Sequence, residues 1–275
     1  MNTLDFTALV ALGSFAAGLL GALTGLGGGV VIVPLLTLLF GVDIHYAIGA
    51  ALVSVIATSS GAAAAYVREG YANIRVGMFL EVATTVGALA GAALVLYLRV
   101  SVISVIFGVM LLYSAYASLW DHAALSANAK PDRMASWLGM DSSYPAPNGF
   151  ENYHVRGVPL AFALMFVAGV LSGLLGIGSG AVKVLAMDKA MKLPFKVSTT
   201  TSNFMIGVTA AAGAGVYLSR GYIDPGLAMP VMLGVLAGSL LGARILAGAR
   251  VGVLRLVFSG VIAVLAAEMI YHGLK

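Results

Sequence analysis

The sequence predicts an all-α polytopic membrane protein built from two copies of one helical unit. Three observations lead to this fold class. The 275 residues are 60% hydrophobic and 9% charged, with a mean hydropathy of +1.01. Apolar stretches of membrane-spanning length recur along the chain, and one gapless register aligns its two halves. A soluble domain carries roughly 25% charged residues, so a chain this poor in charge needs lipid around its surface.

The expected spans and the domain organisation follow from the lengths of the apolar stretches. A helix crosses the bilayer with about 20 apolar residues. Stretches of this kind cover 6–25, 44–67, 76–98, 100–120, 158–175, 197–218, 226–247 and 251–271. Two shorter pieces, 30–40 and 181–191, cannot span alone at 1.5 Å per residue, and each follows a glycine cluster. We predict a first repeat over 1–121, a polar loop over 122–157 and a second repeat over 158–275. Each repeat is expected to hold a glycine-interrupted helix pair, re-entrant or broken, plus three transmembrane helices.

The repeat itself has an offset of 151 residues. It aligns Gly25-Leu-Gly-Gly-Gly29 with Gly176-Ile-Gly-Ser-Gly180. The same offset pairs residues of rarer types, among them Tyr66 with Tyr217, Tyr71 with Tyr222, Arg99 with Arg250 and Phe107 with Phe258. Glycine matches arise by chance in apolar sequence, but Tyr, Arg and Phe matches in one register do not. The halves are therefore predicted to be duplicates.

Loop charge distinguishes inverted from parallel copies, because Lys and Arg gather on the cytoplasmic side. If each glycine segment enters the membrane and returns, the copies are inverted, and eleven basic residues face one side against three on the other. If each segment is a crossing, the copies are parallel and the split is seven to seven. The asymmetry favours two inverted-topology repeats, with the polar loop in the cytoplasm.

Composition limits the partners and the chemistry. The chain has no cysteine, which excludes disulfides, thiolate metal sites and thiol nucleophiles. Its formal charge of +4 is attributed to basic cytoplasmic loops. We therefore expect the lipid bilayer as a partner, and no nucleic acid, cofactor or metal ion. Met1 to Asp5 contains no Lys or Arg, so the first apolar run is predicted to be a permanent helix and not a cleaved signal peptide.

The glycine clusters are the candidate substrate site. A break in a helix leaves free N–H groups, and the short helix that follows begins with unpaired donors and a positive dipole end. Such breaks in inverted repeats are typical of secondary transporters and suit an anion. The alternative is that the glycines only pack helices together, but their matching positions in both halves favour a site. Its expected members are Gly25, Gly27, Gly28, Gly29, Gly176, Gly178, Ser179 and Gly180.

Polar side chains near the breaks extend this site. Lys183 lies three residues after Gly180, where the first half has Ile32. An ionisable residue inside the membrane is a functional hypothesis by default; the alternative is a snorkelling lysine or one paired with Asp188. Further donors to an oxyanion are expected from Ser54, Thr58, Thr200, Thr201, Ser202 and Asn203. These groups could instead bond back to their own helices. Glu81 is a candidate coupling residue or a carboxylate near the headgroups.

At these residues the chain resembles the TauE/SafE family of membrane transporters. The family has a Gly-rich motif with a following Pro in each half, which Gly25-Leu-Gly-Gly-Gly-Val-Val-Ile-Val-Pro34 matches closely. The second copy, Gly176-Ile-Gly-Ser-Gly-Ala-Val-Lys-Val-Leu185, departs at Ser179, at Lys183 and at the missing Pro. The resemblance implies export of sulfite, an organosulfonate or a related sulfur oxyanion across a bacterial plasma membrane.

The sequence thus favours a secondary transporter that exports a small anion by alternating access around the two glycine breaks, without catalytic residues. One alternative is an intramembrane enzyme, because Ser179 and Lys183 are spaced like a nucleophile and its base. Another is a membrane assembly protein without a substrate. The Gly-rich helix faces permit a homodimer.

Overall fold

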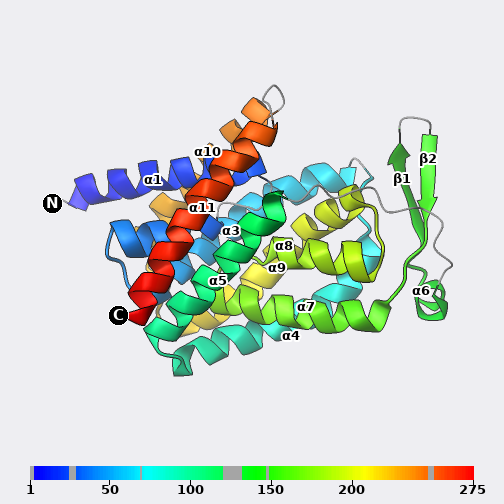
Figure 1. Ribbon diagram of the computed structural model, residues 1–275, viewed down its shortest axis with the longest axis horizontal. Helices are drawn as coiled ribbons and strands as arrows, with labels where there is room; N and C mark the ends of the chain where they lie inside the picture. Colours follow the sequence, from blue (N-terminus) through cyan, green and yellow to red (C-terminus); the bar gives the residue numbers. More distant parts are fainter. Residues whose placement is uncertain (1–2, 25–28, 69, 120–131, 147–148, 247–250) are drawn as a thin grey trace.

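Long helices form most of the structure, with a small hairpin beyond one end of the bundle (Figure 1). The computed structural model describes all residues except 1–2, 25–28, 69, 120–131, 147–148 and 247–250. The first half contains α1 (Thr3–Thr24), α2 (Gly29–Pro34), α3 (Ile44–Arg68), α4 (Ile74–Leu94) and α5 (Val100–Leu119). The second half contains α7 (Val158–Leu175), α8 (Gly180–Leu185), α9 (Phe195–Ser219), α10 (Pro225–Leu246) and α11 (Val251–Leu274). A π-helical turn extends α2 over Leu35–Leu39 and another extends α8 over Ala186–Ala190, and a 3₁₀ turn follows α4 at Val95–Tyr97.

Helix positions follow the sequence offset. Helices α8, α9, α10 and α11 each begin 151 residues after α2, α3, α4 and α5, in that order. Gly70 and Gly221, which follow α3 and α9, both have φ of 75°. Only glycine adopts this backbone conformation without strain, so the same residue type ends the same helix in each half.

The most extensive helix contacts follow the same correspondence: replacing each helix of a contact by its counterpart in the other half gives a contact that is also observed. Helix α1 packs along α10, and α7, which corresponds to α1, packs along α4, which corresponds to α10. The pairs α3–α9 and α5–α11 each join two corresponding helices. The halves are therefore interleaved, and each completes the packing of the other.

Glycines allow the closest of these contacts. A Cβ on Gly87 of α4 would collide with the backbone carbonyl of Phe166 on α7 and would lie 3.1 Å from the Cα of Gly169. A Cβ on Gly238 of α10 would collide with the carbonyl of Phe15 on α1. Small residues let membrane helices approach in this way. Gly87 and Gly238, which are 151 residues apart, therefore act as packing residues.

The helix surfaces suit a bilayer. Within the described residues, three helices are long and apolar enough to cross a membrane: Ile74–Tyr97, Val158–Leu175 and Pro225–Gly242. Large apolar side chains point outward on them, including Met78 at 63% exposure and Leu160 at 59%. Exposed apolar surface on this scale is stable next to lipid.

The prediction of an all-α chain is wrong in the polar loop. This loop contains a short helix, α6 (Arg133–Trp137), and an antiparallel hairpin of β1 (Ser142–Ala146) and β2 (Gly149–Tyr153). Ala146 pairs with Gly149, so two residues connect the strands. The sequence Pro-Asn-Gly at this point is rich in turn formers. The prediction of an extended loop was based on polar composition alone and did not take these turn-forming residues into account.

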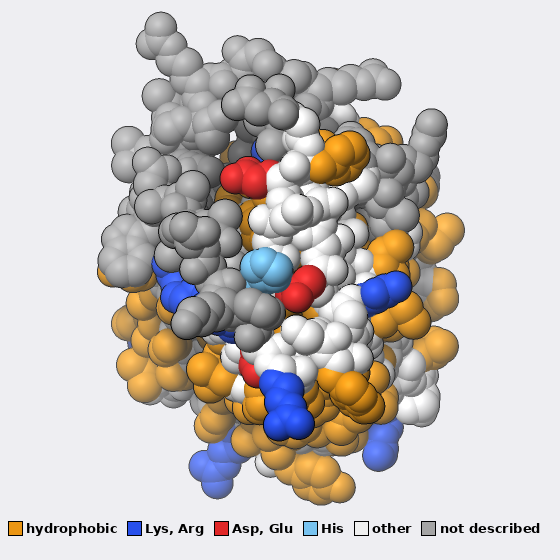
Figure 2. All heavy atoms as spheres, turned by 90° about the vertical axis from the view of Figure 1, so that its right-hand side faces the viewer, with side chains coloured by type: hydrophobic (Ala, Val, Ile, Leu, Met, Phe, Trp, Pro, Cys, Tyr) orange, Lys and Arg blue, Asp and Glu red, His pale blue; other side chains and the backbone are white. Residues whose placement is uncertain are grey.

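The polar loop is anchored to the start of α4. Asn73, the N-cap of α4, accepts a hydrogen bond from the Val76 N–H and donates to Met140 O (2.9 Å) and Tyr153 Oη (2.8 Å). Burial raises the pKa of the Tyr153 phenol, which therefore keeps its proton. Figure 2 views this end of the molecule, where charged side chains lie among polar side chains and backbone, with hydrophobic side chains below and to the right. The loop thus covers one end of the helical bundle.

Candidate functional site

The two glycine segments approach each other inside the bundle. A Cβ on Gly29, the first residue of α2, would lie 3.3 Å from Gly176 O and 3.7 Å from the Ile177 Cα. Gly176 follows directly after α7, and α8 begins four residues later. Gly25, Gly27 and Gly28 lie outside the described residues. The start of α2 is therefore packed on the segment that joins α7 to α8.

The backbone of this connecting segment is unusual. Gly176 and Gly178 have φ of 70°, and Ser179 has φ of 45°. A side chain makes this left-handed conformation costly, so Ser179 is strained where the first copy has glycine. The Ser179 hydroxyl is buried and has no hydrogen-bond partner among the described residues. The Ser179 hydroxyl is therefore a polar group beside the break that has no protein partner in the described part of the chain.

Lys183 is connected to Glu81 through one threonine hydroxyl. Its Nζ donates to Thr209 Oγ1 (2.5 Å), and Thr209 Oγ1 donates to Glu81 Oε1 (2.7 Å). The three residues come from α8, α9 and α4, in that order. Lys183 and Thr209 are 0% exposed and Glu81 is 8% exposed. A lysine and a glutamate from different halves are thus held together in the interior.

Lys183 does not pair with Asp188, which was the alternative considered from the sequence. Asp188 is buried, and its Oδ2 lies 3.7 Å from Lys189 Nζ. Glu81 is buried within the bundle, where Thr85 of the same helix donates to its Oε1 at 3.2 Å. Both charged groups that the sequence marked as candidates therefore belong to one buried cluster.

The other predicted polar residues differ in what they contact. Ser202 Oγ donates to Gly180 O at 3.4 Å, so it touches the start of α8. Ser54, Thr58 and Thr200 bond back to carbonyls of their own helices. Thr201 accepts a hydrogen bond from the Asn73 N–H and so fixes the polar end of α4. Asn203 is half-buried on α9.

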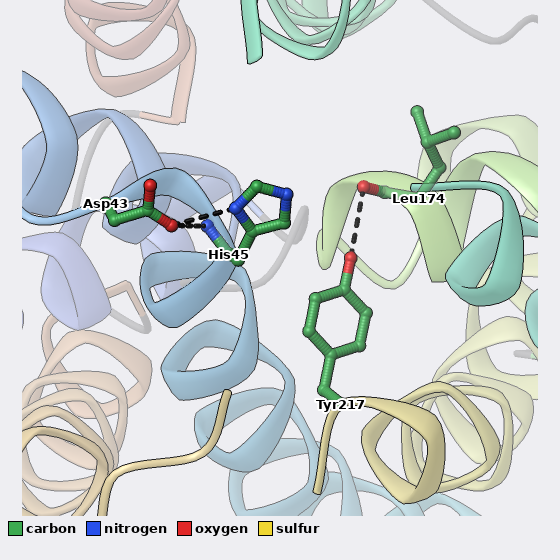
Figure 3. A network of polar contacts seen from close by, with 4 residues as sticks. All are labelled: Asp43, His45, Leu174 and Tyr217. Atoms are coloured by element: carbon green, nitrogen blue, oxygen red, sulfur yellow. Dashed lines mark hydrogen bonds and ion pairs between the residues drawn. The ribbon is translucent and has the colours of Figure 1, made fainter. Parts of the chain in front are cut away.

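Near the ends of α3 and α9, aromatic contacts are again related by the offset. His45 stacks on Tyr222 with ring centroids 5.0 Å apart, and Lys196 lies 5.0 Å from the ring centre of Tyr71. Residues 45 and 196, and residues 71 and 222, are counterparts. Figure 3 shows His45 held by Asp43, with Tyr217 pointing its hydroxyl at the Leu174 carbonyl, 3.5 Å away. Tyr217 thereby binds a carbonyl in the last turn of α7, directly before the break.

Comparisons with known proteins identify the family. The model of the family described as "Sulfite exporter TauE/SafE" matches residues 10–269. The chain belongs to the TauE/SafE family. It is 28% identical to "Probable membrane transporter protein YunE" of Bacillus subtilis (strain 168), over 98% of this chain and 99% of that protein. It is 29% identical to "Probable membrane transporter protein YdhB" of the same organism, over 86% and 89%. It is 25% identical to a "Probable membrane transporter protein" of Xylella fastidiosa (strain 9a5c), over 83% and 78%. No solved structure is significantly similar to the chain.

TauE/SafE membership confirms the resemblance and makes the chain an integral membrane protein and a membrane transporter. The geometry agrees with transport and gives no support to an intramembrane enzyme. Lys183 directs its amine to Thr209, and within the described part of the chain no hydrogen bond activates Ser179. A nucleophile and its base need such a bond.

Thr209 is the residue that sequence reasoning missed. It is a polar residue in the interior of an apolar span, as Lys183 and Glu81 are. That signal was available but weak, because a lone threonine bonds readily to its own helix, and Thr209 also lies 3.0 Å from Met205 O. Its bridging role depends on how α4, α8 and α9 meet.

Proposed function

We propose that this TauE/SafE protein is a secondary transporter that exports a small anion, most favourably sulfite or a related sulfur oxyanion or organosulfonate. The observation that carries the proposal is the meeting of the two glycine segments at Gly29 and Gly176, with Lys183 buried one turn into α8. A lysine ammonium near the first turn of a helix attracts a small oxyanion. The names of the family and its relatives agree with transport and, for the family, with sulfite.

The proposed substrate site is narrower than the set expected from the sequence. It consists of Gly29, the segment 176–180, Lys183 and Ser202, together with Gly25, Gly27 and Gly28 from the first motif. The hydroxyls of Ser54, Thr58, Thr200 and Thr201 support the surrounding helices, because their hydrogen bonds are made to the backbone. Lys183 has no exposed surface, so a substrate reaches it only after the bundle opens on one side.

We further propose that the two halves are inverted repeats that provide alternating access. Exchange of the halves preserves the packing of α1 on α10 and of α4 on α7, as expected for two copies around a pseudo-two-fold axis. The asymmetry of loop charge supports an axis in the membrane plane. The polar loop is then cytoplasmic and the protein resides in the plasma membrane. A homodimer through the outward-facing apolar helices is compatible with this arrangement.

Flux in proteoliposomes tests the transport proposal. Purified protein is reconstituted, and counterflow of radiolabelled sulfite is compared between wild type, Lys183→Ala and Lys192→Asn. Lys192 is exposed and has φ of 59°, a conformation that asparagine tolerates, so this control also removes one charge. We expect flux in wild type and the control and a loss of at least tenfold in Lys183→Ala. No flux of sulfite, or of a simple sulfonate, in wild type would contradict the proposal.

A further inference from the structure

Glu81 has a carboxylate oxygen that the cluster leaves unused. Thr209 and Thr85 both bond to Oε1, whereas Oε2 is buried and has no partner among the described residues. An unpaired carboxylate oxygen in the interior is costly. A ligand that binds this oxygen during function would explain why the protein keeps it. A proton is the smallest such ligand.

We propose that Glu81, Thr209 and Lys183 form a proton-coupling site, through which one proton accompanies each anion. This inference rests on the proposed anion transport. In the absence of substrate, the Glu81 carboxylate balances the Lys183 ammonium through Thr209. When a singly charged anion such as hydrogensulfite binds beside Lys183, a proton from the aqueous phase adds to the Glu81 carboxylate. The cluster and its substrate then carry no net charge, and both ligands leave together on the other side.

The cost of net charge inside a membrane protein explains the coupling. An uncompensated buried charge is expensive in a region of low dielectric constant. The empty cluster is neutral, with one negative and one positive group. Adding only an anion, or only a proton, leaves one charge without a partner. Anion and proton therefore favour each other's binding, and the charge-neutral states are the ones that cross the membrane.

Thr209 is placed to respond to the proton. Its hydroxyl has one hydrogen and two acceptors in reach, Glu81 Oε1 at 2.7 Å and Met205 O at 3.0 Å. It donates to the carboxylate when Glu81 is ionised. When Glu81 is protonated, the hydrogen can turn to the Met205 carbonyl, and Lys183 loses its link to a negative charge. Lys183 then has its charge available to the anion.

The nearby charged side chains in the described part of the chain have other partners. Helix α7, which packs on α4, contains no ionisable residue. On α9, Lys196 lies over Tyr71, at the first turn of the helix. Beyond α8, Asp188 and Lys189 are near each other, and Arg75 at the start of α4 donates to Gly139 O. Among the described residues, Lys183 is therefore the charged group that Glu81 faces.

The symmetry-related position shows that the fold does not require these charges. The counterparts of Glu81, Thr209 and Lys183 are Met232, Thr58 and Ile32. Thr58 bonds back to Ser54 O at 3.0 Å, as Thr209 does to its own helix, and Ile32 is fully buried. The same packing is thus built once with apolar residues and once with a lysine and a glutamate joined through a threonine hydroxyl. The pair is the feature that differs, which assigns it to function.

The test compares sulfite uptake with and without an inward proton gradient, in vesicles whose membrane potential is clamped by potassium and valinomycin. Wild type and Glu81→Gln are compared, because Gln imitates the protonated side chain. When one proton accompanies each anion, each unit of pH difference across the membrane can raise the accumulation of sulfite by up to tenfold. This factor corresponds to about 1.4 kcal/mol. At a given pH, sulfite has the same protonation state in vesicles with wild type and in vesicles with Glu81→Gln. A difference in uptake between these two sets therefore reports on the protein. We expect Glu81→Gln to retain sulfite exchange and to lose this added accumulation.

Threonine variants provide a second readout that keeps both charges. Thr209→Val is expected to weaken the response to the gradient severalfold, whereas Thr58→Val, its counterpart, is expected to leave the response unchanged. Absence of flux in wild type would overturn the proposed function. If wild type and Glu81→Gln transport sulfite with the same response to the proton gradient, the coupling site is overturned but the transport function stands. Loss of sulfite exchange in a correctly folded Glu81→Gln protein would also overturn the coupling site. Equal effects of Thr209→Val and Thr58→Val would also contradict it.

Discussion

The buried ion pair gives the sharpest prediction about stability. Replacing Lys183 by Ile, the residue of the first copy, leaves the ionised form of Glu81 without a positive partner. The 2.5 Å and 2.7 Å contacts that meet at Thr209 Oγ1 keep Lys183 Nζ and Glu81 Oε1 at most about 5 Å apart. At an effective dielectric constant of about 20, their attraction is about 3 kcal/mol. Lys183→Ile should therefore destabilise the protein by about 3 kcal/mol, which is roughly 6–12 °C in Tm for a chain of this size.

The double variant Glu81→Met/Lys183→Ile makes both symmetry-related positions alike and removes the unpaired charge. It should recover most of the lost stability, because replacing both members of a buried ion pair by apolar groups is often neutral. Thermal unfolding in detergent, followed by circular dichroism, measures both variants, with Lys192→Asn as the control. If Lys183→Ile is as stable as wild type, or if the double variant is no more stable than Lys183→Ile, the electrostatic account of the cluster is wrong.

Three further predictions concern the packing, the break and the polar loop. Gly87→Ala should lower stability by about 1–3 kcal/mol, because the added Cβ meets the α7 backbone. Gly215→Ala should be neutral or up to about 1 kcal/mol stabilising, because nothing lies within 4 Å of its Cβ. Thermal unfolding compares the two variants, and equal effects would contradict the packing role of Gly87. Ser179→Gly should relieve about 1 kcal/mol of left-handed strain and keep most sulfite flux, whereas abolished flux would show that its hydroxyl is essential. Asn73→Ala should cost about 1 kcal/mol through loss of the α4 cap and speed cleavage of the hairpin in limited proteolysis, and an unchanged cleavage rate would refute its anchoring role.

Much of the helical architecture could be predicted from the sequence because its boundaries depend on local chemistry. The predicted stretches 44–67 and 158–175 coincide with α3 and α7 within one residue. Glycine and polar residues end these helices, and a bilayer allows few other arrangements for apolar stretches of this length. The hairpin in the polar loop was missed because its pairing depends on a short turn, whose signal is weak beside the overall polar composition.

The candidate site was only partly predictable. The glycine segments and Lys183 stand out in the sequence, because a repeat exposes both what is shared and what differs. The partner of Lys183 could not be found this way. Asp188 is five residues away in the chain, whereas Glu81 is 102 residues away and reaches Lys183 only through the packing of α4 on α9. Which buried polar groups meet is decided by tertiary contacts that one sequence does not display.

An experimental structure determined with saturating sulfite tests the central claim most directly. The account predicts density for one oxyanion within hydrogen-bonding distance of Lys183 Nζ, between Gly29 and the segment 176–180. Lys183→Ala should remove that density while the fold remains intact. Density for sulfite elsewhere in the bundle, or an empty site in a preparation that transports sulfite, would contradict the claim that the two glycine segments and Lys183 bind the substrate.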